Sequence, residues 1–230
     1  SMPPAASGGL VLLQTLNIIE NFNLRTSGHN SAQTVHILSE AMQRAYADRA
    51  QYHGDPDYYN VPVKTLLDKT YSLDLSKEIL ENRTPNGEIF EGDLKKYDES
   101  PDTTHFSIID GEGNAVSNTY TLGSSFGSGV TIAKGGFLMN NQMRNFSHFY
   151  GQVDAEYGTS EANRLEPGKR MISTQTPTLV FKPDGELMMI LGSPGGGRIP
   201  NIITQVISNI IDHDMSYTEA VMAPRINQRL

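Results

Sequence analysis

Pro101-Asp102-Thr103-Thr104-His105-Phe106-Ser107 stands where the chain changes character. A charged, turn-rich linker over residues 83–102 leads into it, and after Thr103 the residues alternate as in a β-strand. A cut before Thr103 would create an N-terminal threonine, whose free amine can act as the base for its own hydroxyl. The plain alternative is a loop that enters a strand. The heptapeptide by itself leaves both interpretations open.

The composition predicts a packed globular chain with one large domain or two small ones. Its 230 residues are 37% hydrophobic and 19% charged. The formal net charge of -8 argues against a nucleic acid partner, because phosphate binding needs a basic face. The absence of cysteine excludes disulfides and thiolate metal ligands. No apolar run approaches the roughly 18 residues that span a bilayer, so no membrane span is expected.

The hydrophobic periodicity predicts an α+β domain with a central sheet and helices packed outside it. Helices are expected over residues 8–21, 31–50, 63–67, 73–80, 199–211 and 217–222. Ser7 is the predicted N-cap of the first helix. Strands are expected over residues 104–109, 115–122, 136–139, 176–182 and 187–191, and the first two and last two form hairpins. Residues 140–169 have no sustained period, which is typical of a long surface loop.

Gly123-Ser124-Ser125-Phe126-Gly127 fits the G-x-S-x-G nucleophile elbow. That elbow needs a helix after it, and the residues that follow, 128–132, predict none. We interpret the match as a coincidence in a flexible loop.

Gly192-Ser193-Pro194-Gly195-Gly196-Gly197-Arg198-Ile199 nearly fits a phosphate-binding Walker A loop. Arg198 and Ile199 replace the lysine and the hydroxyl residue of that loop, so nucleotide chemistry is not expected. The stretch still leads from a strand into a helix, so its backbone N–H groups would point outward at the positive helix end. Two successive glycine amides there could hold a developing oxyanion. A tight turn without chemistry explains the pattern equally well.

The sequence predicts neither a metal site nor a cofactor. His53-Gly54-Asp55-Pro56-Asp57 invites a metal reading, but its glycine and proline indicate a solvated turn. None of the six histidines has the spacing of a zinc site. His105 is expected to pack on the side of its strand opposite to Thr104.

Several motifs, in order along the whole chain, resemble the γ-glutamyltranspeptidase family. They are Ala45-Tyr46-Ala47-Asp48-Arg49, Thr103-Thr104-His105-Phe106-Ser107, Asn118-Thr119-Tyr120-Thr121-Leu122, Asn140-Asn141-Gln142-Met143 and Gly192-Ser193-Pro194-Gly195-Gly196. The resemblance implies an N-terminal-nucleophile hydrolase fold, a four-layer αββα sandwich that is incomplete in this chain. Residues 1–102 would be the C-terminal part of a large-subunit-like region and residues 103–230 a small-subunit-like catalytic region, together one domain.

The resemblance also implies a role for each matching residue. The precursor would cleave itself between Asp102 and Thr103, and Thr103 would become the nucleophile. Thr121 would bond to the nucleophile through its hydroxyl, and Gly195 and Gly196 would form the oxyanion hole. The residues expected to bind the γ-glutamyl donor are Gln142, Asn145, Ser173 and Thr174. No cofactor is expected.

The activity implied is transfer of a γ-glutamyl group, for example from glutathione, to water or to an amino acid or peptide. Family members are commonly exported, so a periplasmic or extracellular location follows from the resemblance alone. The opening residues lack a signal-peptide pattern, and the family's large subunit is longer than residues 1–102. We therefore expect a piece of a longer chain, whose remaining large-subunit segment is a partner and supplies an arginine for the donor's carboxylate.

Three residues depart from the family's pattern. Gly123 stands where an asparagine is usual, and Arg144-Asn145 replaces two aspartates, of which the second pairs with the donor's ammonium group. Loss of that carboxylate removes a charge-assisted bond of about 1.5–3 kcal/mol. Arg144 adds a positive charge that an ammonium would avoid. These changes suit a donor without an α-amino group, such as a glutaryl amide, which related cephalosporin acylases use. A third possibility is an unprocessed, non-catalytic relative.

Overall fold

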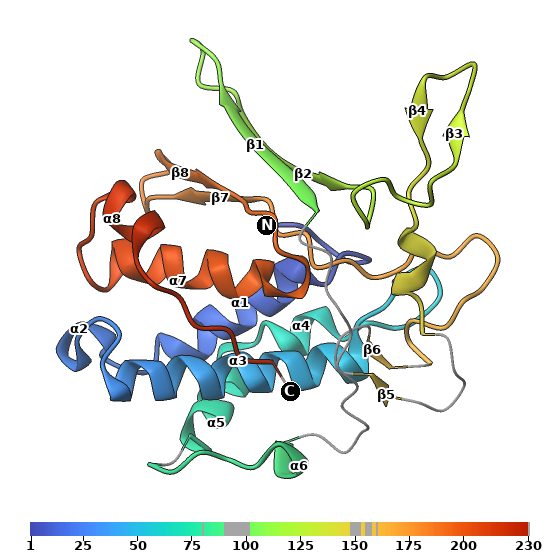
Figure 1. Cartoon of the computed structure of the whole chain (residues 1–230). Coiled ribbons are helices and arrows are strands. Elements are labelled where there is room, and N and C mark those ends of the chain that lie inside the picture. Colours follow the sequence, from blue (N-terminus) through green and yellow to red (C-terminus); the bar gives the residue numbers. More distant parts are fainter. Residues whose placement is uncertain (80, 90–101, 148–152, 155–157, 160, 230) are drawn as a thin grey trace.

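Three helices form the centre of the molecule: α1 (Gly8–Ile19), α3 (Ala32–Tyr52) and α7 (Ile199–Ile211). The computed structural model describes residues 1–79, 81–89, 102–147, 153–154, 158–159 and 161–229 (Figure 1). Helix α1 packs against both α3 and α7. It therefore joins the part of the chain before Asp102 to the part after it. The boundary predicted at Asp102 and Thr103 does not separate two hydrophobic cores.

Two hydrophobic clusters hold these helices together. Leu12 of α1 packs with Ile203 and Ile207 of α7, whereas Ile18 of α1 packs with Met42 of α3. Each of these side chains is at least nine-tenths buried. Burial of one such side chain stabilises the fold by roughly 1.5–3 kcal/mol. Of the apolar residues that predicted the first helix, Ile18 joins α1 to α3, whereas Leu13 is 38% exposed and Leu12, outside the predicted pattern, joins α1 to α7.

The helix predictions are largely confirmed. α3 begins after Ser31, whose side chain accepts a hydrogen bond from the N–H of Thr34 (3.1 Å). α5 (Lys69–Lys77) begins earlier than expected, because the Asp68 carboxylate caps the N–H groups of Thr70 and Tyr71. The remaining short helices are α2 (Leu24–Ser27), α4 (Val63–Leu66), α6 (Asn86–Ile89), η1 (Gln142–Asn145), η2 (Gly196–Arg198) and α8 (Tyr217–Met222). Of these, α2, η1 and η2 were not predicted, and α6 lies inside the predicted linker.

Ser7 stands at the predicted N-cap position of α1, but its side chain does not cap the helix. Ser7 has helical backbone angles and its side chain accepts no capping bond. Its hydroxyl instead donates to the carbonyl of Ser173 (2.9 Å) and accepts from Nε of Arg49 (2.9 Å). These two residues are far away in sequence, so a local pattern could not reveal that the hydroxyl is already engaged.

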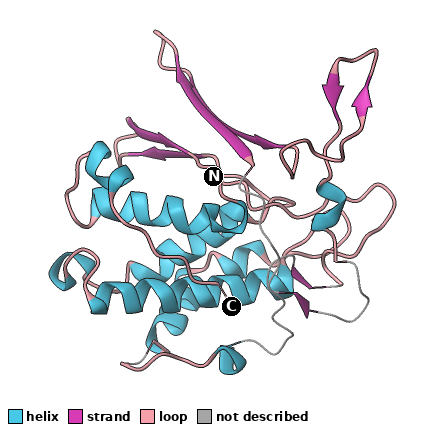
Figure 2. Ribbon diagram, in the orientation of Figure 1, coloured by secondary structure: helices cyan, strands magenta, loops and turns pink. Residues whose placement is uncertain are grey.

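Both predicted hairpins are confirmed. β1 (Thr103–Ile109) pairs with β2 (Ala115–Thr121), and β7 (Thr178–Phe181) pairs with β8 (Leu187–Leu191). Both hairpins lie on one side of the helices (Figure 2), and β7–β8 packs on α1 and α7 through Met189. The two hairpins are joined through Ser117, whose hydroxyl donates to the carbonyl of Leu191 and accepts from the N–H of Thr178.

The other strands are short. The strand expected at 136–139 is β4 (Phe137–Leu138), which pairs with the unpredicted β3 (Thr131–Ile132). β5 (Val153–Asp154) and β6 (Gly158–Thr159) lie in the region predicted as a long loop, part of which falls outside the described residues. In the described ranges, the strands form four separate two-stranded sheets. The α+β class is confirmed, while the four-layer sandwich stays a prediction.

The β1–β2 hairpin carries its apolar side chains on the outside. Thr103 and His105 share the face that looks toward β8, and His105 bonds to the hydroxyl of Thr119 (2.8 Å). His105 therefore lies opposite to Thr104, as predicted, but on the same face as Thr103. The outward apolar side chains of this hairpin are Phe106, Ile108, Val116 and Tyr120, which are 41–55% exposed. A strand face of this kind is normally covered by another layer.

Candidate active site

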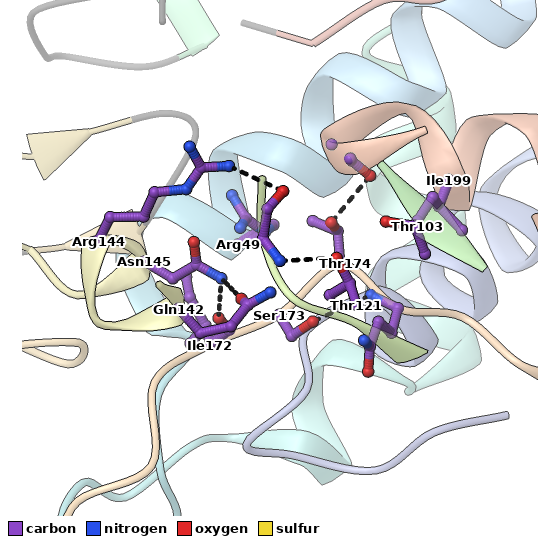
Figure 3. Close-up of a pocket in the computed structure, with 14 residues that line it drawn as sticks. Arg49, Thr103, Thr121, Gln142, Arg144, Asn145, Ile172, Ser173, Thr174 and Ile199 are labelled. Carbon is purple, nitrogen blue, oxygen red and sulfur yellow. Dashed lines mark hydrogen bonds between the residues drawn. The ribbon is translucent and has the colours of Figure 1, made fainter. Parts of the chain in front are cut away.

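One pocket brings together most of the residues that the sequence singled out. Figure 3 shows it between β1, η1, the segment after Ile172 and the turn before α7. The predicted site residues that line it are Thr103, Thr121, Gln142, Asn145, Ser173, Thr174 and Gly196. They come from elements up to 93 positions apart, from Thr103 to Gly196. The hairpin, the 3-10 helix and the glycine turn thus meet at Thr103.

The bond between Asp102 and Thr103 lies beside Thr121. The β1–β2 register places Thr121 directly opposite Thr103. The Thr121 hydroxyl donates to the carbonyl oxygen of Asp102 at 2.7 Å and accepts from the N–H of Gly123 at 2.9 Å. In this uncut chain Thr121 therefore polarises the carbonyl of the bond that would be cut, rather than bonding to the Thr103 hydroxyl. The Asp102 carboxylate accepts from the hydroxyl of Ser125 at 2.6 Å.

The glycine turn needs glycine for its backbone angles. Gly195 has φ +137° and Gly196 has φ +57°, values that favour glycine. Gly196 and Gly197 line the Thr103 pocket, but Gly195 lines a separate hollow with Pro194 and Arg198. Of the two predicted oxyanion donors, Gly196 therefore lines the pocket and Gly195 does not.

Gln142 and Asn145 lie together on η1. The Asn145 side-chain amide donates to Oε1 of Gln142 at 2.6 Å and to the carbonyl of Ile172 at 3.4 Å. The Gln142 oxygen therefore has one donor within the chain and keeps one acceptor position for a substrate. Asn163 holds this turn in place by donating to the carbonyl of Asn145 at 2.6 Å.

Ser173 and Thr174 lie on the segment that leads to β7. The carbonyl of Ser173 accepts from the N–H groups of Ser7 (2.6 Å) and Gly8 (3.2 Å), which ties this segment to the start of α1. The Thr174 hydroxyl donates its proton to the carbonyl of Gly196 at 2.9 Å. A hydroxyl has a single proton, so in this arrangement Thr174 can accept from a substrate but cannot also donate to one.

Two arginines line the pocket, and its described lining contains no acidic side chain. Arg144 of η1 approaches the carbonyl of Gly123 and the hydroxyl of Ser124, both at 3.4 Å. Arg49 of α3 is 2% exposed and reaches Ser7 from behind Ser173. Sequence reasoning flagged Arg144 but not Arg49. The available signal was the Ala45-Tyr46-Ala47-Asp48-Arg49 motif, although nothing local indicated that α3 reaches this pocket.

In the loop after α3, Asp55 is paired with an arginine. No group of metal-binding side chains occurs in the described ranges. Asp55 instead accepts from Nε of Arg170 at 2.9 Å and from its backbone N–H at 2.8 Å, which lowers the pKa of Asp55 to about 2.

No helix follows Gly127, so the nucleophile-elbow match is a coincidence, as predicted. Nor does any helix of the described chain have the length and apolar character to cross a bilayer.

Comparison with known proteins places this arrangement in a family. The family model described as gamma-glutamyltranspeptidase matches residues 1–230. The chain belongs to the gamma-glutamyltranspeptidase family. A glutathione hydrolase proenzyme of Escherichia coli K12 is 44% identical over 232 residues, covering 100% of this chain and 40% of that protein. An acylase ACY 1 proenzyme of Pseudomonas sp. SE83 is 38% identical, covering 97% of this chain and 38% of that protein.

A solved structure extends the comparison to the fold of the family. The crystal structure of a cephalosporin acylase from Bacillus halodurans matches with a TM-score of 0.76 and 30% identity, over 97% of this chain and 37% of that one. The chain thus has the fold of this family, which includes both glutathione hydrolases and acylases. It spans about two-fifths of the length of the curated relatives named above.

The loop at Gly123 leaves no room for a side chain. Gly123 has φ +94°, and a Cβ on it would lie 1.9 Å from Oδ1 of Asn141. The Asn141 amide occupies that space by accepting from the N–H of Ser124 (3.1 Å) and donating to the Ser124 hydroxyl (2.9 Å). An asparagine at 123 could not enter this loop without moving Asn141. Arg144 approaches the same loop through the Gly123 carbonyl.

Proposed function

We propose that this chain is part of a self-processing N-terminal-nucleophile amide hydrolase and acyltransferase that takes a γ-glutamyl donor such as glutathione. The four-layer αββα sandwich is the fold proposed for the whole protein. The observation that carries the proposal is the 2.7 Å bond from the Thr121 hydroxyl to the carbonyl of Asp102, with Thr103 in the same pocket as the glycine turn. Membership of the family supports it.

Self-processing would begin with attack of the Thr103 hydroxyl oxygen on the carbonyl carbon of Asp102. Thr121 would stabilise the negative charge that develops on the Asp102 oxygen. Breaking the C–N bond would leave an ester between Asp102 and Thr103, and the proton from the hydroxyl would pass to the departing amine. Water would then hydrolyse the ester. The products are a carboxylate at Asp102 and a free amine beside the hydroxyl of Thr103.

The same threonine would then act on the donor. With its own amine as base, the Thr103 hydroxyl would attack the donor amide, and the N–H groups of the glycine turn would hold the oxyanion. The amine product would leave with the proton. Water, an amino acid or a peptide amine would release the acyl group from Thr103, which gives ping-pong kinetics. No cofactor is required by this chemistry.

The remaining large-subunit segment is the proposed partner of the outward face of β1–β2. That face exposes Phe106, Ile108, Val116 and Tyr120, and the relatives are more than twice as long as this chain. We propose a periplasmic or extracellular location, by resemblance to the family alone.

A second candidate activity is that of an acylase for donors with a distal carboxylate and no ammonium group, such as glutaryl amides. The described pocket lining carries Arg49 and Arg144 without a carboxylate. Asn145 offers an ammonium no negative charge, and its amide takes one of the two acceptor positions of the Gln142 oxygen. The similarity to acylases supports this candidate. A third candidate is a relative that never processes and only binds its partner segment.

The deciding experiment is the intact mass of the purified full-length protein under denaturing conditions, followed by turnover of γ-glutamyl- and glutaryl-p-nitroanilide. Two chains, of which one begins at Thr103, are expected, whereas the Thr103→Ala variant should remain uncut and inactive. Processing or turnover in that variant would remove Thr103 as the nucleophile. An uncut wild type without turnover would support the non-catalytic candidate. A preference for the glutaryl compound would favour the acylase.

A further inference from the structure

The glycine turn is held by its carbonyl groups. The carbonyl of Gly195 accepts from the N–H of Arg198 (3.1 Å), that of Gly196 accepts from the Thr174 hydroxyl (2.9 Å), and that of Gly197 accepts from the Tyr46 hydroxyl. In a trans peptide the carbonyl of one residue and the N–H of the next point in opposite directions. Fixing the carbonyls therefore fixes the direction of the N–H groups on the other side.

Tyr46 acts on Gly196 through one intermediate bond. Its hydroxyl holds the carbonyl of Gly197, and the same peptide group carries the N–H of Arg198. That N–H donates to the carbonyl of Gly195, whose peptide group carries the N–H of Gly196. Gly196 is the one of the two predicted oxyanion donors that lines the Thr103 pocket.

The position of Tyr46 suits this role. Tyr46 lies in the middle of α3 and is 0% exposed, so its hydroxyl cannot turn to water. The Cζ atom of Arg49 lies 5.8 Å from the centre of the Tyr46 ring. A buried carbonyl without a donor is costly by about 1–3 kcal/mol, which keeps the hydroxyl and the Gly197 oxygen together. The bond also crosses the proposed cleavage point, because α3 precedes Thr103 and the glycine turn follows it.

We propose that Tyr46 is a positioning residue of the oxyanion hole, which aims the Gly196 N–H from the opposite side of the cleavage point. The proposal rests on the proposed amide hydrolysis. A misaimed donor stabilises the charged intermediate less than it stabilises the bound donor, so the effect falls on kcat rather than on KM. Folding is affected less, because the ring stays in place when only the hydroxyl is lost.

The test is Tyr46→Phe in the full-length processed protein. Removal of one direct oxyanion donor costs about 100-fold to 1,000-fold in kcat, so the indirect loss is expected to lower kcat by about tenfold with KM within about twofold. The affinity of a boronic acid analogue of the donor, which places an anionic oxygen in the turn, should fall by a similar factor. Tyr217→Phe is the matched control. The Tyr217 hydroxyl also donates to a backbone carbonyl, that of Met188 (2.9 Å), but neither residue lines the Thr103 pocket.

A kcat for Tyr46→Phe within twofold of wild type would overturn the proposal. So would an unchanged affinity for the boronic acid, which would assign Tyr46 to stability alone. If the wild type turns over no donor, the proposed function fails, but this result does not decide the role of Tyr46. Amide hydrogen exchange then tests whether Tyr46 holds the glycine turn. The peptide containing Gly196 to Arg198 is expected to exchange faster in Tyr46→Phe than in Tyr217→Phe, and equal rates would contradict the role.

Discussion

The hydroxyl oxygen of Thr121 lies 2.7 Å from the carbonyl oxygen of Asp102. This bond joins the end of β2 to the peptide that precedes β1, and it exists because the hairpin register sets Thr121 opposite Thr103. A donor on this oxygen favours attack at the Asp102 carbon, because it stabilises the negative charge that develops on the oxygen. Four predictions follow from this and neighbouring contacts.

Replacing Thr121 by valine should slow self-cleavage by about 10-fold to 100-fold, because the valine keeps the shape of threonine but cannot stabilise the developing charge on the Asp102 oxygen. Thr121→Ser should keep most of the rate. The measurement is the fraction of uncut chain against time by intact mass. Thr131→Val is a control, since Thr131 is exposed on β3. Normal processing in Thr121→Val would contradict the assigned role of this hydroxyl.

Restoring two carboxylates at 144 and 145 should move the donor preference toward γ-glutamyl compounds. In Arg144→Asp/Asn145→Asp, a substrate ammonium gains a charged partner and loses a repelling guanidinium, which is expected to change the ratio of the two kcat/KM values by at least about tenfold. The ratio is measured with γ-glutamyl- and glutaryl-p-nitroanilide. Lys134→Asp makes one comparable charge change on an exposed loop and should leave the ratio unaltered. An unchanged ratio in the double variant would show that the η1 residues do not select donors by the charge of the α-amino group.

Gly123→Ala should destabilise the protein more than two other glycine substitutions do. At Gly123 the positive φ and the Asn141 contact both oppose a side chain, whereas Gly113 has only the positive φ (+88°) and Gly111 has neither. We expect a loss of about 1–3 kcal/mol at 123, about 1 kcal/mol at 113 and little at 111. The free energy of unfolding in urea measures all three. An equal loss in the free energy of unfolding for Gly123→Ala and Gly111→Ala would contradict the steric account.

Buried His53 should make the fold sensitive to acid. Burial, together with the nearby Arg49 charge, lowers the pKa of His53 to about 3 from its ordinary value of 6.5. The unfolded chain therefore binds a proton that the folded chain does not, between about pH 6.5 and 3, and stability falls as the pH falls through this window. The slope from this one residue is at most about 1.4 kcal/mol per pH unit.

His53→Leu removes that proton uptake, so its free energy of unfolding should change less between pH 7 and pH 4 than that of the wild type. Urea titrations at several pH values provide the comparison. An equally steep acid dependence in the variant would mean that other groups, not His53, set it.

Much of the fold was readable from local pattern. The alternation after Thr103 predicted the β1–β2 hairpin, and helical spacing predicted α1, α3 and α7, because period and turn residues act over a few positions. A short pattern could not reveal β3, whose two residues, Thr131 and Ile132, are held only by pairing with β4.

By itself the sequence determined the junction at Asp102 and Thr103, the hairpin that sets Thr121 opposite Thr103, and the glycine turn before α7. Only the tertiary structure decided which partners those residues meet. It turned Ser7 from a cap into a link between Arg49 and Ser173, and it brought the hydroxyl of Tyr46 to a carbonyl 151 positions away. The physical reason is that period and turn chemistry are properties of neighbouring residues. A buried hydrogen bond across the core instead depends on how α1, α3 and α7 pack, which no single stretch encodes.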